Sequence, residues 1–323
     1  MNRRHFLSVI GAVGLPVWLG ACERDYAPLR IASYVWPGYE FMFLAQREGW
    51  LVDRNIDLIE TGSATESIKL LETGRVDGAA LTLDEMLGAR VRGLPLTAVL
   101  IFDISLGVDV LLAKPGIDNM QQLNGKRIAY EPSAVGALML HKALSAAGLE
   151  LEQVETVLVT FDQHEAVWRA GKVDAIVTFE PVARRLESEG AQRLFDSSQI
   201  PDTIFDVLAV TPAAIQGKSK ALRHLISGHF RGLRNFQKNP NDTAYRMAER
   251  FHLPAKEVLA AYSGLELPSI YRNLKLLRGA NPPLSDKARE LSEFLFQTGI
   301  MPDKLNDFSG LSNADFIPPE VIS

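Results

Sequence analysis

The sequence predicts an α/β protein built from two similar lobes. Apolar, strand-like runs alternate with helical patterns along most of the 323 residues, an order typical of a mostly parallel sheet with helices on its faces. One motif occurs twice, as Gly74-Arg75-Val76-Asp77 and, 97 residues later, as Gly171-Lys172-Val173-Asp174. Each copy places a glycine and a basic residue, which suit a helix C-terminus, directly before a buried strand. The echo indicates that both halves contain the same structural unit.

The elements follow one another in a regular order. In the first half we expect strands at 29–34, 56–60, 78–82 and 96–102, and helices at 39–50, 66–73 and 83–92. In the second half we expect strands at 108–114, 127–130, 154–160, 173–179 and 206–210, and a helix at 135–147. From Ser219 onward apolar residues recur mostly three or four apart, so the pattern becomes helical and these helices should pack back on the first lobe. The first lobe therefore comprises residues 29–111 plus 208–323, and the second comprises residues 112–207.

Residues 1–21 have the pattern of an export signal. Arg3 and Arg4 precede an uncharged run of about 15 residues, shorter than the roughly 20 that span a bilayer, and the run ends in Leu19-Gly20-Ala21-Cys22. This predicts cleavage before Cys22, membrane anchoring through lipid on its thiol, and a tether over residues 22–28. We expect the protein in the periplasm or on the cell surface. The paired arginines fit a twin-arginine signal, with an ordinary basic leader as the alternative.

Composition excludes several classes of function. Hydrophobic residues make up 47% and charged residues 23% of the chain, as in globular proteins, and a net charge of −5 offers no basic face for nucleic acid. Cys22 is the only cysteine, so we expect no disulfide, thiolate metal site or cysteine nucleophile in the mature chain. The histidines after Cys22 show no metal-site spacing: they are His141, His164, His224, His229 and His252. No phosphate-binding loop or nucleophile elbow is present. We therefore expect a protein that binds a ligand without catalysing a reaction.

Strand-to-helix junctions of the first half supply candidate ligand contacts. In open parallel sheets a ligand lies beyond the carboxyl ends of the strands, where helix N-termini present free N–H groups. Trp36 and Tyr39 offer flat surfaces for stacking. Ser63 and Thr82 begin capping-box patterns that could be purely structural, whereas Asp84 either points at a ligand or stabilises the helix start. The candidates here are Trp36, Tyr39, Glu40, Ser63, Thr65, Thr82 and Asp84.

The second half adds Ser133, Gly136 and Glu180 as candidates. Ser133 and Gly136 lie in a junction of small residues that exposes backbone N–H groups, and Glu180 could accept hydrogen bonds from a ligand or act as a plain helix cap. Asp109, near the crossover between the lobes, lies in an apolar strand and needs a cationic partner or a ligand. The junctions carry several carboxylates and no arginine or lysine. This favours a ligand with an amino group or several hydrogen-bond donors, although helix N-termini could still bind an anion.

Several motifs, in their order and spacing, resemble the nitrate, sulfonate and taurine class of ABC substrate-binding proteins, which includes binders of thiamine pyrimidine precursors. They are Val35-Trp36-Pro37-Gly38-Tyr39-Glu40, Gly74-Arg75-Val76-Asp77, Thr82-Leu83-Asp84-Glu85, Leu123-Asn124-Gly125-Lys126 and Val173-Asp174-Ala175-Ile176-Val177-Thr178-Phe179-Glu180-Pro181. They cover nearly the whole chain after Cys22. The resemblance implies a two-lobed periplasmic-binding-protein fold of type II, with two mixed sheets, flanking helices and a cleft that closes about a hinge.

The resemblance also implies a function. It predicts a monomeric solute-binding lipoprotein that captures a small molecule and delivers it to an ABC permease in the inner membrane. The ligand would be a sulfonate, a taurine-like compound, an aminopyrimidine or another amine-bearing compound. One alternative is a ligand-sensing lipoprotein that reports to a membrane receptor. Another alternative is an enzyme similar to the thiamine-pyrimidine synthases. The resemblance implies that such an enzyme needs a cysteine-rich iron motif, which a single cysteine, Cys22, cannot supply. We therefore expect no enzymatic activity, no cofactor and no metal.

Overall fold

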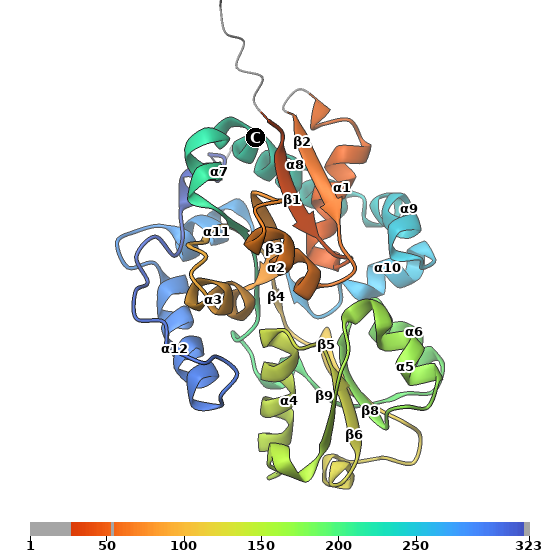
Figure 1. Cartoon of the computed structure of the whole chain (residues 1–323). Coiled ribbons are helices and arrows are strands. Elements are labelled where there is room, and N and C mark those ends of the chain that lie inside the picture. Colours follow the sequence, from red (N-terminus) through yellow and green to blue (C-terminus); the bar gives the residue numbers. More distant parts are fainter. Residues whose placement is uncertain (1–26, 53–54, 320–323) are drawn as a thin grey trace, which may run out of the picture.

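Two β-sheets with flanking helices make up the computed structural model, which describes residues 27–52 and 55–319 (Figure 1). This arrangement confirms the predicted α/β class with two mixed sheets. The predicted export signal, Cys22 and most of the predicted tether lie outside the described residues. Within the described part of the chain, no helix combines the length and the apolar character needed to cross a membrane.

The first sheet has the strand order β11-β4-β10-β3-β1-β2. Its strands are β1 (Leu29–Ser33), β2 (Ile56–Glu60), β3 (Gly78–Thr82), β4 (Thr97–Ser105), β10 (Phe205–Val210) and β11 (Leu265–Glu266). β1 is parallel to β2 and β3, whereas β10 inserts antiparallel between β3 and β4. β3, β4 and β10 are buried along their whole length, which explains their continuous apolar character in the sequence.

The second sheet has the order β7-β6-β8-β5-β9. Its strands are β5 (Asp109–Ala113), β6 (Arg127–Tyr130), β7 (Glu155–Leu158), β8 (Ala175–Phe179) and β9 (Gln192–Asp196). β5 is antiparallel to both β8 and β9, while β6 is parallel to β7 and β8. The predicted lobe boundaries at residues 111 and 207 fall inside β5 and β10, each of which belongs to a single sheet.

Helices cover both sheets (Figure 1). They are α1 (Glu40–Arg47), α2 (Ala64–Glu72), α3 (Leu83–Val91), α4 (Ala134–Ala146), α5 (His164–Arg169), α6 (Val182–Ser188), α7 (Pro212–Gly217), α8 (Ser219–Lys238), α9 (Pro240–Phe251), α10 (Ala255–Ala261), α11 (Ile270–Leu277) and α12 (Pro283–Gln297). The long helix α8 packs against α1, and α11 contacts β4. The helices after residue 219 thus lie mainly against the first sheet.

The chain passes between the sheets twice, between β4 and β5 and between β9 and β10. The two connections are tied together where they run side by side. The hydroxyl groups of Ser105 and Ser197 lie 2.6 Å apart, and the backbone N–H of Gly107 donates to Ser197 Oγ at 2.7 Å. The backbone N–H of Ser105 also donates to the carbonyl of Ile204 at 3.0 Å. The short connections therefore hold the adjoining edges of the two sheets together.

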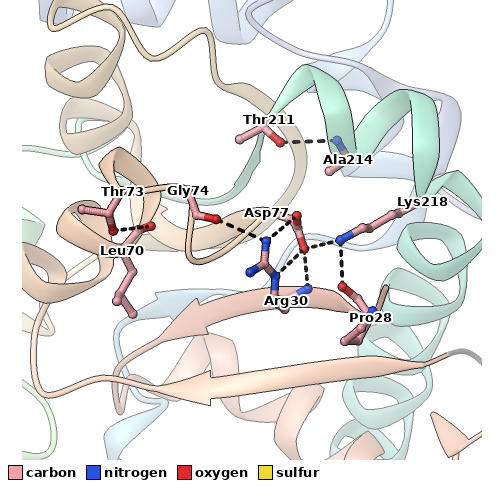
Figure 2. Close-up of polar contacts among 9 residues, drawn as sticks. All are labelled: Pro28, Arg30, Leu70, Thr73, Gly74, Asp77, Thr211, Ala214 and Lys218. Carbon is pink, nitrogen blue, oxygen red and sulfur yellow. Dashed lines mark hydrogen bonds and ion pairs between the residues drawn. The ribbon is translucent and has the colours of Figure 1, made fainter. Parts of the chain in front are cut away.

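The echoed motif in the first lobe fixes the end of α2 to β1 (Figure 2). Asp77 accepts hydrogen bonds from the backbone N–H of Arg30 at 2.8 Å and from its Nε at 3.3 Å, while Arg30 Nη2 donates to the carbonyl of Gly74 at 3.3 Å. Lys218 Nζ adds a contact of 2.7 Å to Asp77 and one of 2.8 Å to the carbonyl of Pro28. The start of α8 is thereby joined to the first strand.

The second lobe repeats these bonds without the lysine. Asp174 accepts from the backbone N–H of Arg127 at 2.9 Å and from its Nε at 3.0 Å, and Arg127 Nη2 donates to Gly171 at 3.2 Å. Arg127 follows Arg30 at the same interval of 97 residues that separates the glycines. Both glycines have a φ of +65°, which favours glycine and ends the preceding helix.

Replacing Asp77 with asparagine should lower the free energy of unfolding by about 1–3 kcal/mol at pH 7. Burial disfavours ionisation of Asp77, but the hydrogen bonds from Arg30 and Lys218 outweigh it and hold the pKa below its usual value of 3.8. A lowered carboxyl pKa stabilises the fold above the unfolded value, and this contribution is lost as the pH falls through the folded value. Urea unfolding should show the D77N deficit shrinking as the pH falls below about 4.

The matched variant Asp174→Asn should lower the free energy of unfolding by less than D77N does. Hydrogen bonds from Arg127 also lower the pKa of Asp174, but its side chain is 29% exposed against 13% for Asp77, and no lysine of the described chain forms an ion pair with it, although the charge of Lys126 helps to lower its pKa. A larger loss for Asp174→Asn than for D77N would contradict the role given to Lys218.

Candidate ligand-binding site

The two lobes meet through aromatic side chains. The first lobe contributes Tyr34 and Trp36, and the second contributes Phe161 and Phe179, all less than 9% exposed. The ring of Trp36 meets Phe179 edge-on with centroids 5.2 Å apart, and Tyr34 lies 5.7 Å from Phe179 and 6.2 Å from Phe161. Phe161 and Phe179 stack at 4.0 Å. The four rings therefore form an aromatic wall between the sheets, and its surface is suited to the flat face of a ligand.

Two buried carboxyls of the first sheet lie side by side behind this wall. Asp103 on β4 and Asp206 on β10 are cross-strand neighbours, and Thr82 on β3 lies opposite Asp206 on its other side. Trp36 Nε1 donates to Asp103 Oδ2 at 2.9 Å, and the Tyr39 hydroxyl donates to Asp206 Oδ1. The second oxygen of each carboxyl has no hydrogen-bond partner among residues 27–52 and 55–319. Trp36 and Tyr39 thus orient carboxyls as well as offering ring surfaces.

The start of α3 adds two more buried carboxyls. Neither oxygen of Asp84 has a hydrogen-bond partner in the described part of the chain, and Glu85 Oε1 has none either, while its Oε2 accepts the backbone N–H of Thr82 at 3.0 Å. Burial raises the pKa of Asp84 to about 7, with Asp109 nearby adding to the effect. Burial and the neighbouring Asp84 raise the pKa of Glu85 to about 8. Contacts with Thr82, and for Glu85 also with Ser133 of the second lobe, only partly oppose these rises in pKa.

The second lobe contributes a small pocket of its own. Asp109, Glu131, Ser133 and His164 line it together with Phe179. Asp109 Oδ2, Ser133 Oγ and His164 Nε2 have no hydrogen-bond partner among the described residues. Burial raises the pKa of Asp109 to about 6 and also raises that of Glu131. A polar lining of this kind is costly unless a ligand satisfies it.

One hydrogen-bonded link joins the lobes beside this pocket. Thr65, in the first turn of α2, donates to Glu131 Oε1 from its backbone N at 2.9 Å and from its hydroxyl at 2.6 Å. Ser63 caps the same helix by accepting the backbone N–H of Glu66 at 3.2 Å, and its hydroxyl helps to lower the pKa of Glu131. Both predicted residues of this junction therefore lie at the interface between the lobes.

Positive charge is missing from the centre of the site. The six central carboxyls are Asp84, Glu85, Asp103, Asp109, Glu131 and Asp206. Burial raises the pKa of Asp103 to about 7, and the charge of Asp109 adds to this rise, whereas the contacts with Trp36 and Asp206 oppose it. Burial and the charges of Asp103 and Asp109 raise the pKa of Asp206 well above its usual value. No lysine or arginine among the described residues figures in the pKa of any of the six. No group of three or more metal-ligating side chains in the described chain has the arrangement of a metal site. The arrangement is suited to a cation or to strong hydrogen-bond donors.

Two predicted residues lie apart from the central carboxyls. Glu40 forms an ion pair with Arg250 of α9, and both line a groove with Phe43 that is separate from the central pocket. Glu180 accepts a hydrogen bond from Arg184 at 3.2 Å, although burial still raises its pKa and its Oε2 has no partner in the described chain. Glu40 therefore joins α1 to α9, and the structure gives it no contact with the other candidates.

At two positions a neighbouring residue lies so close to the backbone that only glycine fits. A Cβ on Gly38 would lie 1.6 Å from Asp103 Oδ2, so the Asp103 carboxyl occupies the space in front of this backbone. A Cβ on the predicted residue Gly136 would lie 2.4 Å from the carbonyl oxygen of Glu131. Gly136 therefore lets the junction before α4 fold tightly and sets the position of Glu131.

Sequence reasoning missed several residues of the site. They are Tyr34, Glu85, Glu131, Phe161, His164, Phe179 and Asp206, whereas Asp103 raises the same question as Asp109 less strongly. The signal that identified Asp109, a carboxyl inside an apolar strand, also applies to Asp103 and Asp206. Glu131 directly follows β6 and belongs to a junction that was recognised for its small residues instead. Nothing in the sequence distinguishes His164 from a packing histidine.

Comparison with known proteins identifies relatives of two kinds. The taurine-binding periplasmic protein of Escherichia coli is 21% identical over 271 residues, which cover 81% of this chain and 83% of the relative. A 4-amino-5-hydroxymethyl-2-methylpyrimidine phosphate synthase of Saccharomyces cerevisiae is 26% identical over 143 residues, 43% of this chain. The match spans only 42% of that synthase's length.

Solved structures share the fold. The alkanesulfonate-binding protein of Xanthomonas axonopodis pv. citri superposes with a TM-score of 0.74 at 17% identity, covering 86% of this chain and 95% of that one. The nitrate-binding protein of Synechocystis PCC 6803 gives 0.70 at 10% identity, covering 90% and 87%. These matches confirm the predicted periplasmic-binding-protein fold. The family model described as NMT1/THI5 like matches residues 36–243, well over half of the chain. The chain therefore belongs to the NMT1/THI5-like family.

Proposed function

We propose that this protein is the solute-binding component of an ABC importer and holds a small polar organic molecule between its two lobes. The observation that carries the proposal is the set of six buried carboxyls, none of whose pKa values is shifted by an arginine or lysine of the described chain. The binding proteins among the relatives support it, since their names record taurine, alkanesulfonate and nitrate as ligands. The permease partner would recognise the closed, loaded form.

The ligand carries an amino group or another N–H-rich cationic end. Among the compounds suggested by the resemblance, an aminopyrimidine, another amine or the amine end of a taurine-like zwitterion meets opposite charge at Asp84, Asp103 and Asp109. A sulfonate or nitrate alone would face several carboxyls with raised pKa values, and each ionised carboxyl would repel it. The aromatic wall of Trp36 and Phe179 favours a flat ligand.

The lobes move about the two connections. We assign residues 29–105 and 205–319 to the first lobe and 109–196 to the second, with hinges at 106–108 and 197–204. The contacts between Trp36 and Phe179 and between Thr65 and Glu131 would close over the ligand. Closure removes the charged end of the ligand from water and strengthens its attraction to the carboxyls.

The protein acts at a membrane surface as a monomeric lipoprotein. Residues 1–21 serve as its export signal, and lipid on Cys22 anchors it to a membrane in the periplasm or at the cell surface. Mass spectrometry of the N-terminal peptide from the host should find acylated Cys22. The protein has no enzymatic activity of its own: the single cysteine leaves the yeast-type synthase chemistry without an iron-binding motif. A receptor-coupled sensor would use the same site.

A thermal-shift screen tests the function. The panel contains taurine, alkanesulfonates, nitrate, aminopyrimidines, amino acids, polyamines and 4-aminopyridine, applied to the chain starting at residue 23. A true ligand at about 100 times its dissociation constant should add about 2.7 kcal/mol to the free energy of unfolding. Amines should raise the melting temperature and quench the fluorescence of Trp36. Stabilisation by nitrate or simple sulfonates, with none by any amine, would overturn the proposed ligand class.

A matched pair of variants separates binding from folding. Trp36→Phe keeps an aromatic ring but removes the N–H that Asp103 accepts, so affinity for the ligand found in the screen should fall by about tenfold with a smaller loss of stability. Glu40→Gln weakens the ion pair with Arg250 away from the carboxyls, so stability should fall while affinity stays unchanged. Isothermal titration and thermal melts measure both. The opposite pattern would place the site in the groove beside Glu40.

A further inference from the structure

His164 is held in one orientation inside the second lobe. It begins α5, is 1% exposed, and its Nδ1 lies 3.1 Å from the hydroxyl oxygen of Thr178 on β8. Its ring meets Phe161 edge-on, with centroids 5.5 Å apart. Since Phe161 in turn stacks on Phe179, the imidazole is braced against the same aromatic wall that faces the first lobe. The ring cannot turn without breaking these contacts.

The other nitrogen of this ring points to the pocket of the second lobe. His164 lines that pocket with Asp109, Glu131 and Ser133, and its Nε2 has no hydrogen-bond partner among the described residues. Burial lowers the pKa of His164 to about 4, against the opposing influence of a hydrogen bond to the Val159 backbone and the charge of Asp162. The imidazole is therefore neutral at pH 7 and carries a single N–H.

The placement of that proton follows from the partners. A backbone carbonyl can only accept a hydrogen bond, so the bond with Val159 needs an N–H on the ring. Because Nε2 has no partner in the described chain, the proton belongs on Nδ1, on the side of Thr178. Nε2 then presents a lone pair to the pocket.

We propose that Nε2 of His164 accepts a hydrogen bond from an N–H of the ligand and makes the site selective for cations that carry N–H groups over cations that lack them. This assignment rests on the proposed binding of an amine between the lobes. Carboxylates attract any cation, whether a primary amine or a fully alkylated one. A neutral acceptor does not attract a cation by charge. It increases affinity only for a ligand whose N–H donor lies where a hydrogen bond can form. Amidines and amino-heterocycles, which carry adjacent N–H groups, could satisfy Asp109 and His164 together.

A pair of probes of equal charge tests the selectivity. Both 4-aminopyridine and 4-(dimethylamino)-1-methylpyridinium are cations at pH 7, but only the first carries N–H groups. Isothermal titration of the wild-type chain should show that 4-aminopyridine binds about tenfold more tightly. Equal affinity for the two probes would overturn the role of His164 and leave the amine-binding site intact. Failure of either probe and of every amine in the screen to bind would overturn the proposed function and this assignment with it.

Two variants of similar size identify the atom responsible. His164→Gln keeps a polar group near the position of Nε2, so it should retain most of the preference for 4-aminopyridine. His164→Leu fills the same space without an acceptor, so it should bind both probes with equal affinity. A purely structural role would change the two affinities by the same factor and leave their ratio as in the wild type. Retention of the wild-type ratio in H164L would therefore contradict the proposal, whatever its melting temperature.

Nuclear magnetic resonance tests the proton position without any ligand. In protein with ¹⁵N-labelled histidine, long-range ¹H–¹⁵N spectra should show Nε2 of His164 as an unprotonated nitrogen and Nδ1 as the protonated one. A protonated Nε2 in the wild-type protein would make it a donor and would overturn the assignment.

Discussion

Replacing Asp84 with asparagine is expected to raise the stability of the ligand-free protein and to weaken the binding of a cationic ligand. Asp84 is fully buried, and its contacts with the Thr82 side chain and the backbone only partly oppose the rise in its pKa, so its negative charge costs folding free energy that the neutral amide does not. The same charge attracts a cation between the lobes. Loss of a buried charge partner costs about 2–5 kcal/mol of binding free energy, so affinity should fall at least about thirtyfold.

The pH dependence gives this prediction a sign that can be checked. Burial raises the pKa of Asp84 from 3.8 in the unfolded chain to about 7 in the folded protein. Between these values the folded protein binds more protons, so stability falls as the pH rises through this window and stays low above it. D84N removes this loss. Its advantage over the wild type should be small at pH 4 and reach a few kcal/mol at pH 8.

Thermal melts at pH 4 and pH 8, with titration of 4-aminopyridine at pH 7, measure both effects. Asp57→Asn, on the exposed edge strand β2, removes one negative charge far from the central carboxyls and should change neither quantity. A D84N protein that is less stable than the wild type at pH 8 would show that the carboxyl has a structural partner.

Gly136→Ala is expected to destabilise the protein by about 1–3 kcal/mol and to weaken ligand binding as well. The added methyl group would lie 2.4 Å from the carbonyl oxygen and 3.3 Å from the backbone nitrogen of Glu131, so the junction before α4 must open. Glu131 would then lose its position against Thr65, and with it the hydrogen-bonded link between the lobes. Urea unfolding and titration of 4-aminopyridine should both show the loss.

Gly88→Ala provides the matched control. Gly88 lies inside α3, and the nearest atom to an added Cβ is Arg92 Nη1 at 3.5 Å, an ordinary contact. Alanine should therefore stabilise the helix by about 0.5–1 kcal/mol. If both substitutions had the same effect on stability, close backbone approach at Gly136 would not be the cause.

The fold was predictable from the sequence because many strands are short apolar runs, and β1, β3, β6 and β8 are each followed by a helix. The mixed character of the first sheet was not predictable from these runs. β10 lies more than a hundred residues after β3 and β4, yet it inserts between them in antiparallel direction, and only the packed sheet sets that register. The pairing of Asp103 with Asp206 follows from this register and could not be read from either strand alone.

The junctions named from the sequence lie at the ends of the strands in the structure, but the contacts of their individual side chains could not be predicted. Consecutive residues at a helix start point in different directions, about 100° apart, so a shift of one position decides what a side chain meets. Tyr39 reaches Asp206 between the lobes, whereas its neighbour Glu40 reaches Arg250 of α9. The partner of each depends on α9 and β10, which are distant in sequence.

The two sheets differ in how much of the chain they need. The second uses only β5 to β9, one continuous segment, whereas the first needs β10, β11 and the anchorage of Asp77 to Lys218. As the polypeptide emerges from the ribosome, the second lobe can be complete while the first still lacks an inner strand. Biogenesis should therefore proceed from the middle of the chain outward, and the half-made first lobe is the species that a chaperone would need to shield.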